Sequence, residues 1–310
     1  MEAEYHIPVL LQEAIDGLDI QENGTYVDVT FGGGGHSRQI LRGLGPEGRL
    51  LAFDRDPDAA ARAAQDSDFV RAGHRFILVR ENFRYLKNYL RFYKVVPVDG
   101  ILADLGVSSH QFDVAERGFS IRSHGPLDMR MDQAGSLTAS EVLNTYSEEE
   151  LARIFVQYGE IPFGRRLASA VVKAREEASF EYTDQAVDFF IPFAGKGKEN
   201  KFLATVFQAL RIEVNGEMEN LKGLLAQSLE VLKPGGRLVV ISYHSLEDRM
   251  VKNFMRSGNV EGRIEKDFYG NDLSPVEPVS RKAVMPTEEE LTRNPRSRSA
   301  RLRVARKKEL

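Results

Sequence analysis

Short apolar runs alternate with helical patterns over the first third of the chain. The runs at residues 25–30, 49–53, 75–79 and 99–104 have the length of buried strands. A helical pattern follows the first run, and Asp56-Pro57 opens another helix with proline in its first turn. Strands that alternate with helices are typical of βαβ units, so the pattern predicts a parallel sheet.

The middle of the chain has helical patterns and lacks strand-like runs. The segment from Ser147 to Glu150 is a capping-box pattern, followed by apolar residues at helical spacing as far as Tyr158. Similar stripes occupy residues 163–176 and 183–191. The pattern therefore predicts an all-helical insertion within an α/β domain.

We place this insertion at residues 112–205, between residues 1–111 and 206–310 of the α/β domain. Within it, the polar stretch 195–200 is expected to be a mobile loop.

Strand-like patterns return in the last third of the chain. Residues 218–232 predict a helix, Lys233–Gly236 a turn and residues 238–243 a buried strand. Residues 257–290 are rich in polar groups and prolines and are expected to be irregular. Alternation at Leu302 and Val304 predicts a last strand, antiparallel to its neighbour.

Composition limits the kinds of site the chain can carry. Its 310 residues include no cysteine, which excludes disulfides and thiolate metal ligands, and its six histidines are scattered, so no metal site is expected. The net charge is −4, and no apolar run approaches the ~20 residues of a membrane span. We expect a soluble cytoplasmic protein without membrane contact; the sequence leaves the oligomeric state open, a homodimer included.

The most informative segment runs from Tyr26 to His36, where an apolar run ends in four consecutive glycines. Glycine allows φ > 0 and lets the backbone lie directly against a ligand. Asp54 follows Gly34 by 20 positions, at the end of the second apolar run, where a carboxylate can accept both hydrogen bonds of a ribose diol. The combination predicts a site for an adenosine-bearing cofactor.

The spacing of the glycines indicates which cofactor. A dinucleotide fingerprint would need a third glycine where Ser37 stands, and a phosphate-binding loop would need a Gly-Lys-Ser/Thr sequence. The pattern Asp28-x-Thr30-x-Gly32-x-Gly34 is instead similar to the first motif of class I S-adenosylmethionine methyltransferases, with Thr30 in place of the usual first glycine. A tight turn that binds nothing is the alternative, and the spacing to Asp54 argues against it.

Residues at the ends of later strands extend the predicted site. Phe83 follows the third strand and either stacks on adenine or packs in the core. Asp104 ends the fourth strand, so it either faces the same crevice as Gly34 or caps the following helix. His244 follows the strand at 238–243, where it relays a proton, holds the nucleotide or bonds to a loop carbonyl as a structural histidine.

Longer motifs extend over most of the chain. They are His6–Leu11, Asp104–Gln111, Arg117–Ser120, Gly125–Asp132, Phe207–Ile212 with Val214-Asn215, Ser242–Arg249 and Asn294–Ala300. Together they resemble the RsmH/MraW family, bacterial methyltransferases that act on the N4 amine of a cytidine in 16S ribosomal RNA.

The resemblance implies a Rossmann-like class I methyltransferase domain with an inserted all-helical domain, S-adenosyl-L-methionine as cofactor, and 16S rRNA or the small ribosomal subunit as partner. It implies cofactor contacts at Gly34, Gly35, His36, Asp54, Phe83, Asp104 and Gln111.

The chain departs from the family pattern at two places. Phe202–Val206 replaces a usual His-Pro-Ala-Thr-Arg, which puts in doubt any RNA contact made by that histidine and arginine. Tyr243 replaces a usual phenylalanine and adds one hydroxyl.

A cytosine N4 amine is a poor nucleophile because its lone pair is delocalised into the ring. Acceptors that orient its N–H groups and hold it in line with the methyl donor would assist the transfer. We therefore assign a catalytic role to Asp104, which orients the amine or the cofactor, and a second one to His244.

A cluster of cationic residues near the C-terminus indicates RNA contact despite the negative net charge, although a solvated basic terminus would have the same composition. Its members are Arg293, Arg296, Arg298, Arg301, Arg303, Arg306, Lys307 and Lys308.

Methylation of another nucleic-acid or protein amine, and a non-catalytic role in ribosome assembly, are the alternative functions of the protein.

Overall fold

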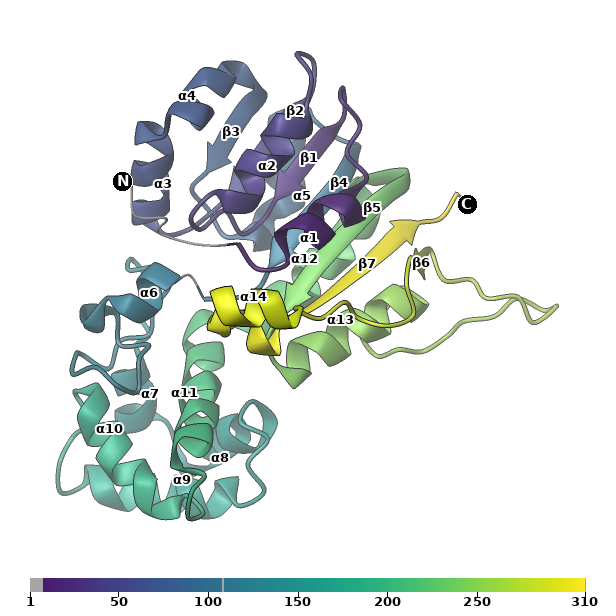
Figure 1. Cartoon of the computed structure of the whole chain (residues 1–310). Coiled ribbons are helices and arrows are strands. Elements are labelled where there is room, and N and C mark those ends of the chain that lie inside the picture. Colours follow the sequence, from purple (N-terminus) through teal and green to yellow (C-terminus); the bar gives the residue numbers. More distant parts are fainter. Residues whose placement is uncertain (1–7, 108, 310) are drawn as a thin grey trace. The chain divides into compact units, whose positions relative to one another are not determined.

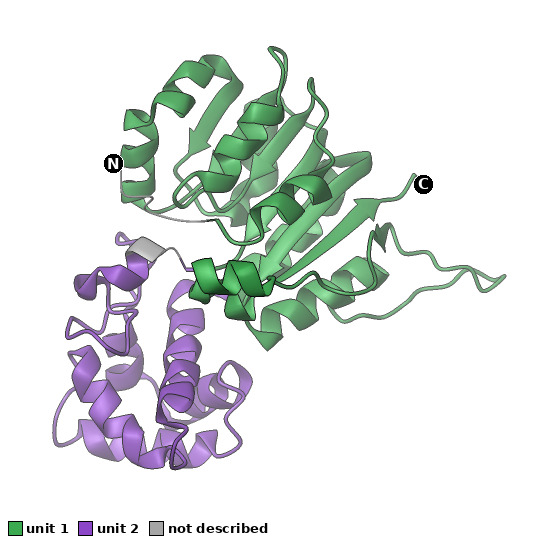
Figure 2. Ribbon diagram, in the orientation of Figure 1, with its two compact units in different colours: residues 1–106, 218–310 green, residues 107–217 purple. Residues whose placement is uncertain are grey.

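The computed structural model describes residues 8–107 and 109–309, so His6 and Ile7 of the first motif and Ser108 of the second lie outside the described residues. The chain forms two compact units, residues 1–106 with 218–310 and residues 107–217 (Figure 2). The second unit is longer than the insertion expected at 112–205.

The first unit is built on a seven-stranded sheet of order β3-β2-β1-β4-β5-β7-β6 (Figure 1). The strands are β1 Thr25–Asp28, β2 Arg49–Phe53, β3 Phe76–Val79, β4 Val98–Asp104, β5 Leu232–Ser242, β6 Val276–Pro278 and β7 Arg301–Lys307. Strands β1 to β5 pair in parallel, and β7 is antiparallel to β5. The predicted α/β fold, its parallel strands and its antiparallel last strand are confirmed.

Helices cover both faces of this sheet because successive strand residues point to opposite sides. Val27 and Leu51 belong to the core beneath one group of helices, whereas their neighbours Tyr26 and Leu50 belong to the core on the other face. The first group is α5 Leu86–Phe92, α12 Glu217–Val231 and α13 Ser245–Ser257; the second is α1 Leu11–Leu18, α2 Gly35–Gly43, α3 Pro57–Gln65 and α4 Ser67–Ala72. Both faces are buried, as expected for strands that read as continuous apolar runs.

The turn expected at Lys233–Gly236 lies inside β5 rather than before it. Val98 pairs with Leu232, but Gly100 already pairs with Arg237, so the residues between Leu232 and Arg237 bulge out of the ladder. Gly235 adopts φ +80° in this bulge, which accounts for the turn-like sequence.

The long segment after α13 is mostly irregular, as expected. It contains the short strand β6, which the sequence analysis missed, and it ends in α14 Glu288–Arg293. Among the described residues, no helix combines the length and apolar character needed to span a membrane.

The second unit consists of helices around its own apolar core. They are α6 Ser109–Asp113, α7 Ala139–Thr145, α8 Glu148–Gln157, α9 Gly164–Arg175, α10 Thr183–Phe190 and α11 Glu199–Asn215. The capping box at Ser147 and Glu150 is confirmed. The loop expected at 195–200 ends earlier, because Glu199 already opens α11. The apolar face of this helix is buried in the core of the second unit through Leu203, Val206, Phe207, Ala209 and Leu210.

Candidate active site

The carboxyl ends of β1, β2, β3 and β4 lie at the same edge of the sheet, since these strands are parallel neighbours. The strand order reverses between β1 and β4, because the chain proceeds from β1 to β2 and β3 on one side and to β4 on the other (Figure 1). Ligands of open α/β sheets bind outside the carboxyl ends at such a switch point. Most of the predicted site residues stand in the loops at this edge.

The glycine turn follows β1 and leads directly into α2. Gly32 and Gly34 have φ of +52° and +74°, and Gly34 is the N-cap residue of α2 without a side chain to cap it. A Cβ on Gly34 would lie 2.8 Å from the ring of Phe69, and one on Gly35 would lie 2.1 Å from Pro8. The turn therefore needs glycine at both positions, and it opens the N–H groups at the start of α2 to a ligand.

Asp54, at the end of β2, is bonded to the glycine turn. Its Oδ2 accepts a hydrogen bond from the backbone N–H of Gly32 at 2.7 Å, and its Oδ1 accepts one from Asp56 at 2.9 Å. Burial raises the pKa of the Asp54 carboxyl to about 6, although both backbone donors act in the opposite direction. Asp54 thus braces the turn and is a carboxylate whose charge changes just below neutral pH.

Asp28 is a second buried carboxylate, which the sequence analysis placed in the motif but not in the site. It is 1% exposed and accepts hydrogen bonds from Ser37 Oγ at 2.7 Å and from the N–H of Thr30 at 3.0 Å. Burial raises its pKa, against the opposing effects of His36 and Ser37. Its position at the end of a buried strand could have indicated a role in the site, since a buried carboxylate needs hydrogen-bond partners.

Asp104, at the end of β4, lies next to His36 of α2. Its Oδ2 is 3.9 Å from His36 Nδ1, and its backbone N–H donates to Thr30 Oγ1 at 2.7 Å. His36 is buried, and its Nε2 lies 3.1 Å from the carbonyl oxygen of Val9. A neutral His36 therefore carries its proton on Nε2 and presents Nδ1 as an acceptor beside the Asp104 carboxylate.

Phe83 begins a short 3₁₀ turn, Phe83–Tyr85, after β3. Its ring is partly buried against the core on the α5 face of the sheet. This contact agrees with the core interpretation, and stacking on adenine stays a prediction.

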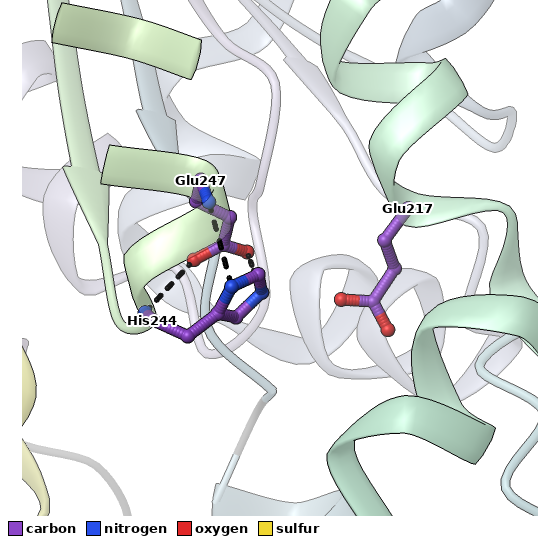
Figure 3. Close-up of side chains that lie close together, drawn as sticks. All are labelled: Glu217, His244 and Glu247. Carbon is purple, nitrogen blue, oxygen red and sulfur yellow. Dashed lines mark hydrogen bonds and ion pairs between the residues drawn. The ribbon is translucent and has the colours of Figure 1, made fainter. Parts of the chain in front are cut away.

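His244 is held at the start of α13 (Figure 3). Its Nδ1 accepts a hydrogen bond from the backbone N–H of Glu247 at 3.4 Å, and its Nε2 lies 3.1 Å from Glu247 Oε1 without the alignment of a hydrogen bond. Glu247 in turn accepts from the N–H of Tyr243 at 2.9 Å. The ring therefore has a structural task as a helix cap, and its catalytic role stays a prediction.

Comparison with known proteins identifies the family. A model of the MraW methylase family matches residues 3–308 of the chain. The chain belongs to the MraW methylase family. It is 57% identical over 307 residues to a protein of Bacteroides thetaiotaomicron named ribosomal RNA small subunit methyltransferase H, and the match covers 99% of each chain.

Proteins of other organisms carry the same name. One from Parabacteroides distasonis is 56% identical over 304 residues, covering 98% of this chain and 97% of that protein. One from Flavobacterium johnsoniae is 53% identical over 304 residues, covering 98% of each chain. The resemblance to this family is thus confirmed over nearly the whole chain.

Two features of this MraW family member belong to the second unit. Gln111, an expected cofactor contact, is 6% exposed there, and its contact with the cofactor stays a prediction. Glu217, also drawn in Figure 3, belongs to the same unit and accepts two hydrogen bonds from Arg211, each 2.8 Å long.

The departure at Phe202–Val206 has a structural explanation in this MraW family member. Phe202 stacks on Phe163 with ring centroids 5.8 Å apart, and Val206 is fully buried in the core of the second unit. The apolar replacements thus pack within the second unit.

At least four of the eight cations in the basic cluster near the C-terminus have partners within the first unit. Arg301 and Arg303 both donate to the carboxylate of Asp248, and Arg306 pairs with Glu277. Lys307 Nζ donates to the carbonyl oxygens of Leu229 and Leu232 at 2.5 and 2.7 Å, where α12 meets β5. These four cations therefore hold the sheet and its helices together, which leaves fewer of them for RNA.

Proposed function

We propose that the protein transfers a methyl group from S-adenosylmethionine to the N4 amine of a cytidine in 16S rRNA of the small ribosomal subunit. The observation that carries the proposal is the convergence of Gly34, His36, Asp54 and Asp104 at the carboxyl edge of the sheet, in a chain of the MraW methylase family. Its relatives at 53–57% identity are named small-subunit ribosomal RNA methyltransferases.

The residues at this edge fit the cofactor. Each oxygen of the Asp54 carboxylate accepts one backbone N–H, from Gly32 or Asp56, and keeps a lone pair for one hydroxyl of a ribose diol. The turn at Gly34 and the N-terminus of α2 would hold the methionine end, where backbone N–H groups favour a carboxylate. When bound, the cofactor supplies a methyl group activated by a positively charged sulfur.

Two acceptors lie where a donor N–H group could be held. Asp104 Oδ2 and His36 Nδ1 are 3.9 Å apart, and both side chains are at most 14% exposed. A carboxylate accepts hydrogen bonds only, and in a neutral His36 the contact of Nε2 with the carbonyl oxygen of Val9 leaves Nδ1 as a second acceptor. These acceptors would hold the N–H groups of an amine so that its lone pair is free to face the methyl group of a bound cofactor, and one of the two would take the proton that the amine gives up on methylation.

Removal of the Asp104 carboxylate tests this assignment. We expect Asp104→Ala to lower the rate of methyl transfer by about 100-fold or more, the usual contribution of a positioned acid–base or electrostatic group. Asp16→Ala, which removes an exposed aspartate of α1, is the matched control and should leave the rate unchanged. Turnover near wild type in Asp104→Ala, with S-adenosylhomocysteine still bound in a calorimeter, would remove Asp104 from the catalytic machinery.

We also infer that the second unit contacts RNA. Arg165, Arg166 and Lys173 are exposed on α9, whereas Arg175 of the same helix donates to the carbonyl oxygens of Leu143 and Tyr146. Exposed cations on one helix suit phosphates, and a target base must leave its stack to reach the site, so contacts to flanking RNA would assist.

Replacement of Arg165 and Arg166 by alanine should weaken rRNA binding and lower the salt slope of log K by about 0.9 for each phosphate that is no longer neutralised. Arg49→Ala with Arg71→Ala removes the same charge from exposed positions of the first unit and is the control. Equal effects of the two pairs on the salt slope would contradict a dedicated RNA-binding role of α9.

A further inference from the structure

Tyr243 delivers a hydroxyl to the carboxylate at the centre of the site. Its Oη–H donates to Asp104 Oδ1 at 2.8 Å, while Asp104 Oδ2 is the oxygen that faces His36 Nδ1 at 3.9 Å. The two oxygens of one carboxylate therefore have different tasks. One is bound to a protein donor, and the other remains the acceptor on the His36 side.

The register of the sheet places Tyr243 beside Asp104. Asp104 pairs with Ile241 in the parallel ladder of β4 and β5, so Tyr243 lies two residues beyond its partner and on the same face as Ile241. The backbone N–H of Tyr243 donates to Glu247 at 2.9 Å, which anchors the residue to the first turn of α13. The position of the hydroxyl is thus determined by the sheet at one end and by a helix cap at the other.

Gly106 leaves the space that the ring occupies. A Cβ at residue 106 would lie 2.7 Å from Tyr243 Cε2 and 3.0 Å from Cζ, closer than real Cβ contacts. The ring therefore lies directly against the backbone two residues after Asp104. Because its plane is held by this contact and its backbone by Glu247, the hydroxyl has little freedom to leave Asp104.

The charges that face this hydroxyl keep its proton on it. Burial raises the pKa of Tyr243 well above its ordinary value, and the carboxylates of Asp104, Glu247 and Glu290 act in the same direction. Tyr243 is thus a donor at every working pH, and the bond it makes to a charged acceptor belongs to the stronger class of hydrogen bonds.

We propose that Tyr243 is a positioning residue for methyl transfer: its hydroxyl fixes the rotamer of Asp104 through Oδ1 and so aims Oδ2 at the N–H group to be held beside His36. This proposal rests on the proposed function only in assuming that Asp104 acts on the cofactor or the acceptor amine. The hydroxyl itself touches neither, so its whole effect passes through Asp104.

A double-mutant cycle tests the proposal. Tyr243→Phe keeps the ring that packs on Gly106 and removes only the hydroxyl. We expect kcat for methyl transfer to small subunits to fall about tenfold, the usual loss for one hydrogen bond to a charged group, with KM for the RNA substrate unchanged. In an Asp104→Ala background the same substitution should cost less than twofold, because the side chain on which the hydroxyl acts is absent.

Tyr26→Phe is the matched control. Tyr26 is a buried tyrosine of β1, and its hydroxyl accepts from the N–H of Gln21 at 2.7 Å, away from the site. This variant loses a buried hydroxyl in the same way, so it should lower the melting temperature without a change in kcat. Equal losses of kcat in Tyr26→Phe and Tyr243→Phe would indicate a general loss of stability and would overturn the proposal.

A second readout separates this proposal from the proposed function. The same cycle is measured on the binding of S-adenosylhomocysteine by calorimetry, where any loss of affinity in Tyr243→Phe should appear in the wild-type background and not in Asp104→Ala. If the wild-type protein transfers no methyl group to rRNA, the proposed function fails and the binding cycle alone decides the role of Tyr243. Equal effects in both backgrounds, or no effect of Tyr243→Phe on either kcat or affinity in the wild-type background, would overturn the positioning role.

Discussion

The ionisation of Asp54 should set the pH dependence of cofactor affinity. With a pKa of about 6, the charged fraction of this carboxyl falls from about nine-tenths at pH 7 to about one-tenth at pH 5. A carboxylate accepts both hydrogen bonds of a diol, whereas its protonated form must donate one. The apparent Kd for S-adenosylhomocysteine should therefore rise about tenfold when the pH is lowered from 7 to 5, in proportion to the loss of the charged form of Asp54.

Asp54→Asn is the variant that tests this reasoning. Asparagine is close in shape but carries no titrating charge, so its affinity should be weaker at pH 7 and should lack this pH dependence. Calorimetric Kd values for both proteins at each pH give a ratio from which titration of the ligand cancels. The ratio should approach one near pH 5. A ratio that stays constant from pH 5 to pH 8 would refute the role of the Asp54 charge.

The same pKa predicts the sign of an effect on stability. A folded-state pKa near 6, above the ordinary 3.8, means that the folded protein binds this proton more tightly than the unfolded chain. The stabilisation linked to Asp54 is therefore complete below about pH 4 and is lost as the pH rises through 6, by up to about 3 kcal/mol for two pKa units. The melting temperature of Asp54→Asn relative to the wild type should therefore rise as the pH is raised from about 4 to above 6. A difference that does not change with pH would contradict the raised pKa of Asp54.

Three further substitutions test the structure around the site. Gly34→Ala should lower the free energy of unfolding by about 1–3 kcal/mol and weaken S-adenosylhomocysteine binding, because the residue has φ +74° and its Cβ would meet Phe69. A free energy of unfolding and an affinity equal to those of the wild type would contradict the need for glycine in this turn. Asp248→Asn should lower the melting temperature at pH 7. Burial alone would raise the pKa of Asp248, but hydrogen bonds from Arg303 and Arg301 hold it below 3.8. The difference in melting temperature between the variant and the wild type should therefore shrink as the pH falls below about 4, because the wild-type carboxylate becomes protonated. A difference that persists at pH 2 would count against the ion pairs. Lys307→Met should lower the free energy of unfolding in urea by about 1–3 kcal/mol, because two carbonyl oxygens lose their donor. Arg306→Met, which breaks an exposed ion pair, should lower it by much less, and the reverse order would refute the bracing role of Lys307.

The parts of the fold that follow from local pattern could be predicted. Strands β1 to β4 read as apolar runs because both faces of a parallel sheet are buried, and their order along the chain places Gly34, Asp54 and Asp104 at one edge. The helix at Ser147 was readable from its cap. Each of these depends on residues that are near one another in sequence or on a general rule of topology.

Other features depend on contacts between distant residues and could not be read from the chain. The bulge in β5 is defined by its pairing with β4, and the basic cluster near the C-terminus looked free because its partners Asp248 and Glu277 lie on other elements. The hydroxyl of Tyr243 was visible as a small change in a motif, but its bond to Asp104 joins residues 139 positions apart. Such side-chain contacts follow from register and packing rather than from composition or spacing.

Methyl transfer to small ribosomal subunits tests the central claim most directly. Subunits from a strain that lacks the gene are incubated with the purified protein and S-adenosylmethionine carrying a labelled methyl group, and the modified nucleotide is then mapped. The account predicts one labelled cytidine in 16S rRNA, with the methyl group on N4, and a loss of label of about 100-fold or more with Asp104→Ala. Label on a protein, on another base or on no component of the subunit would contradict it.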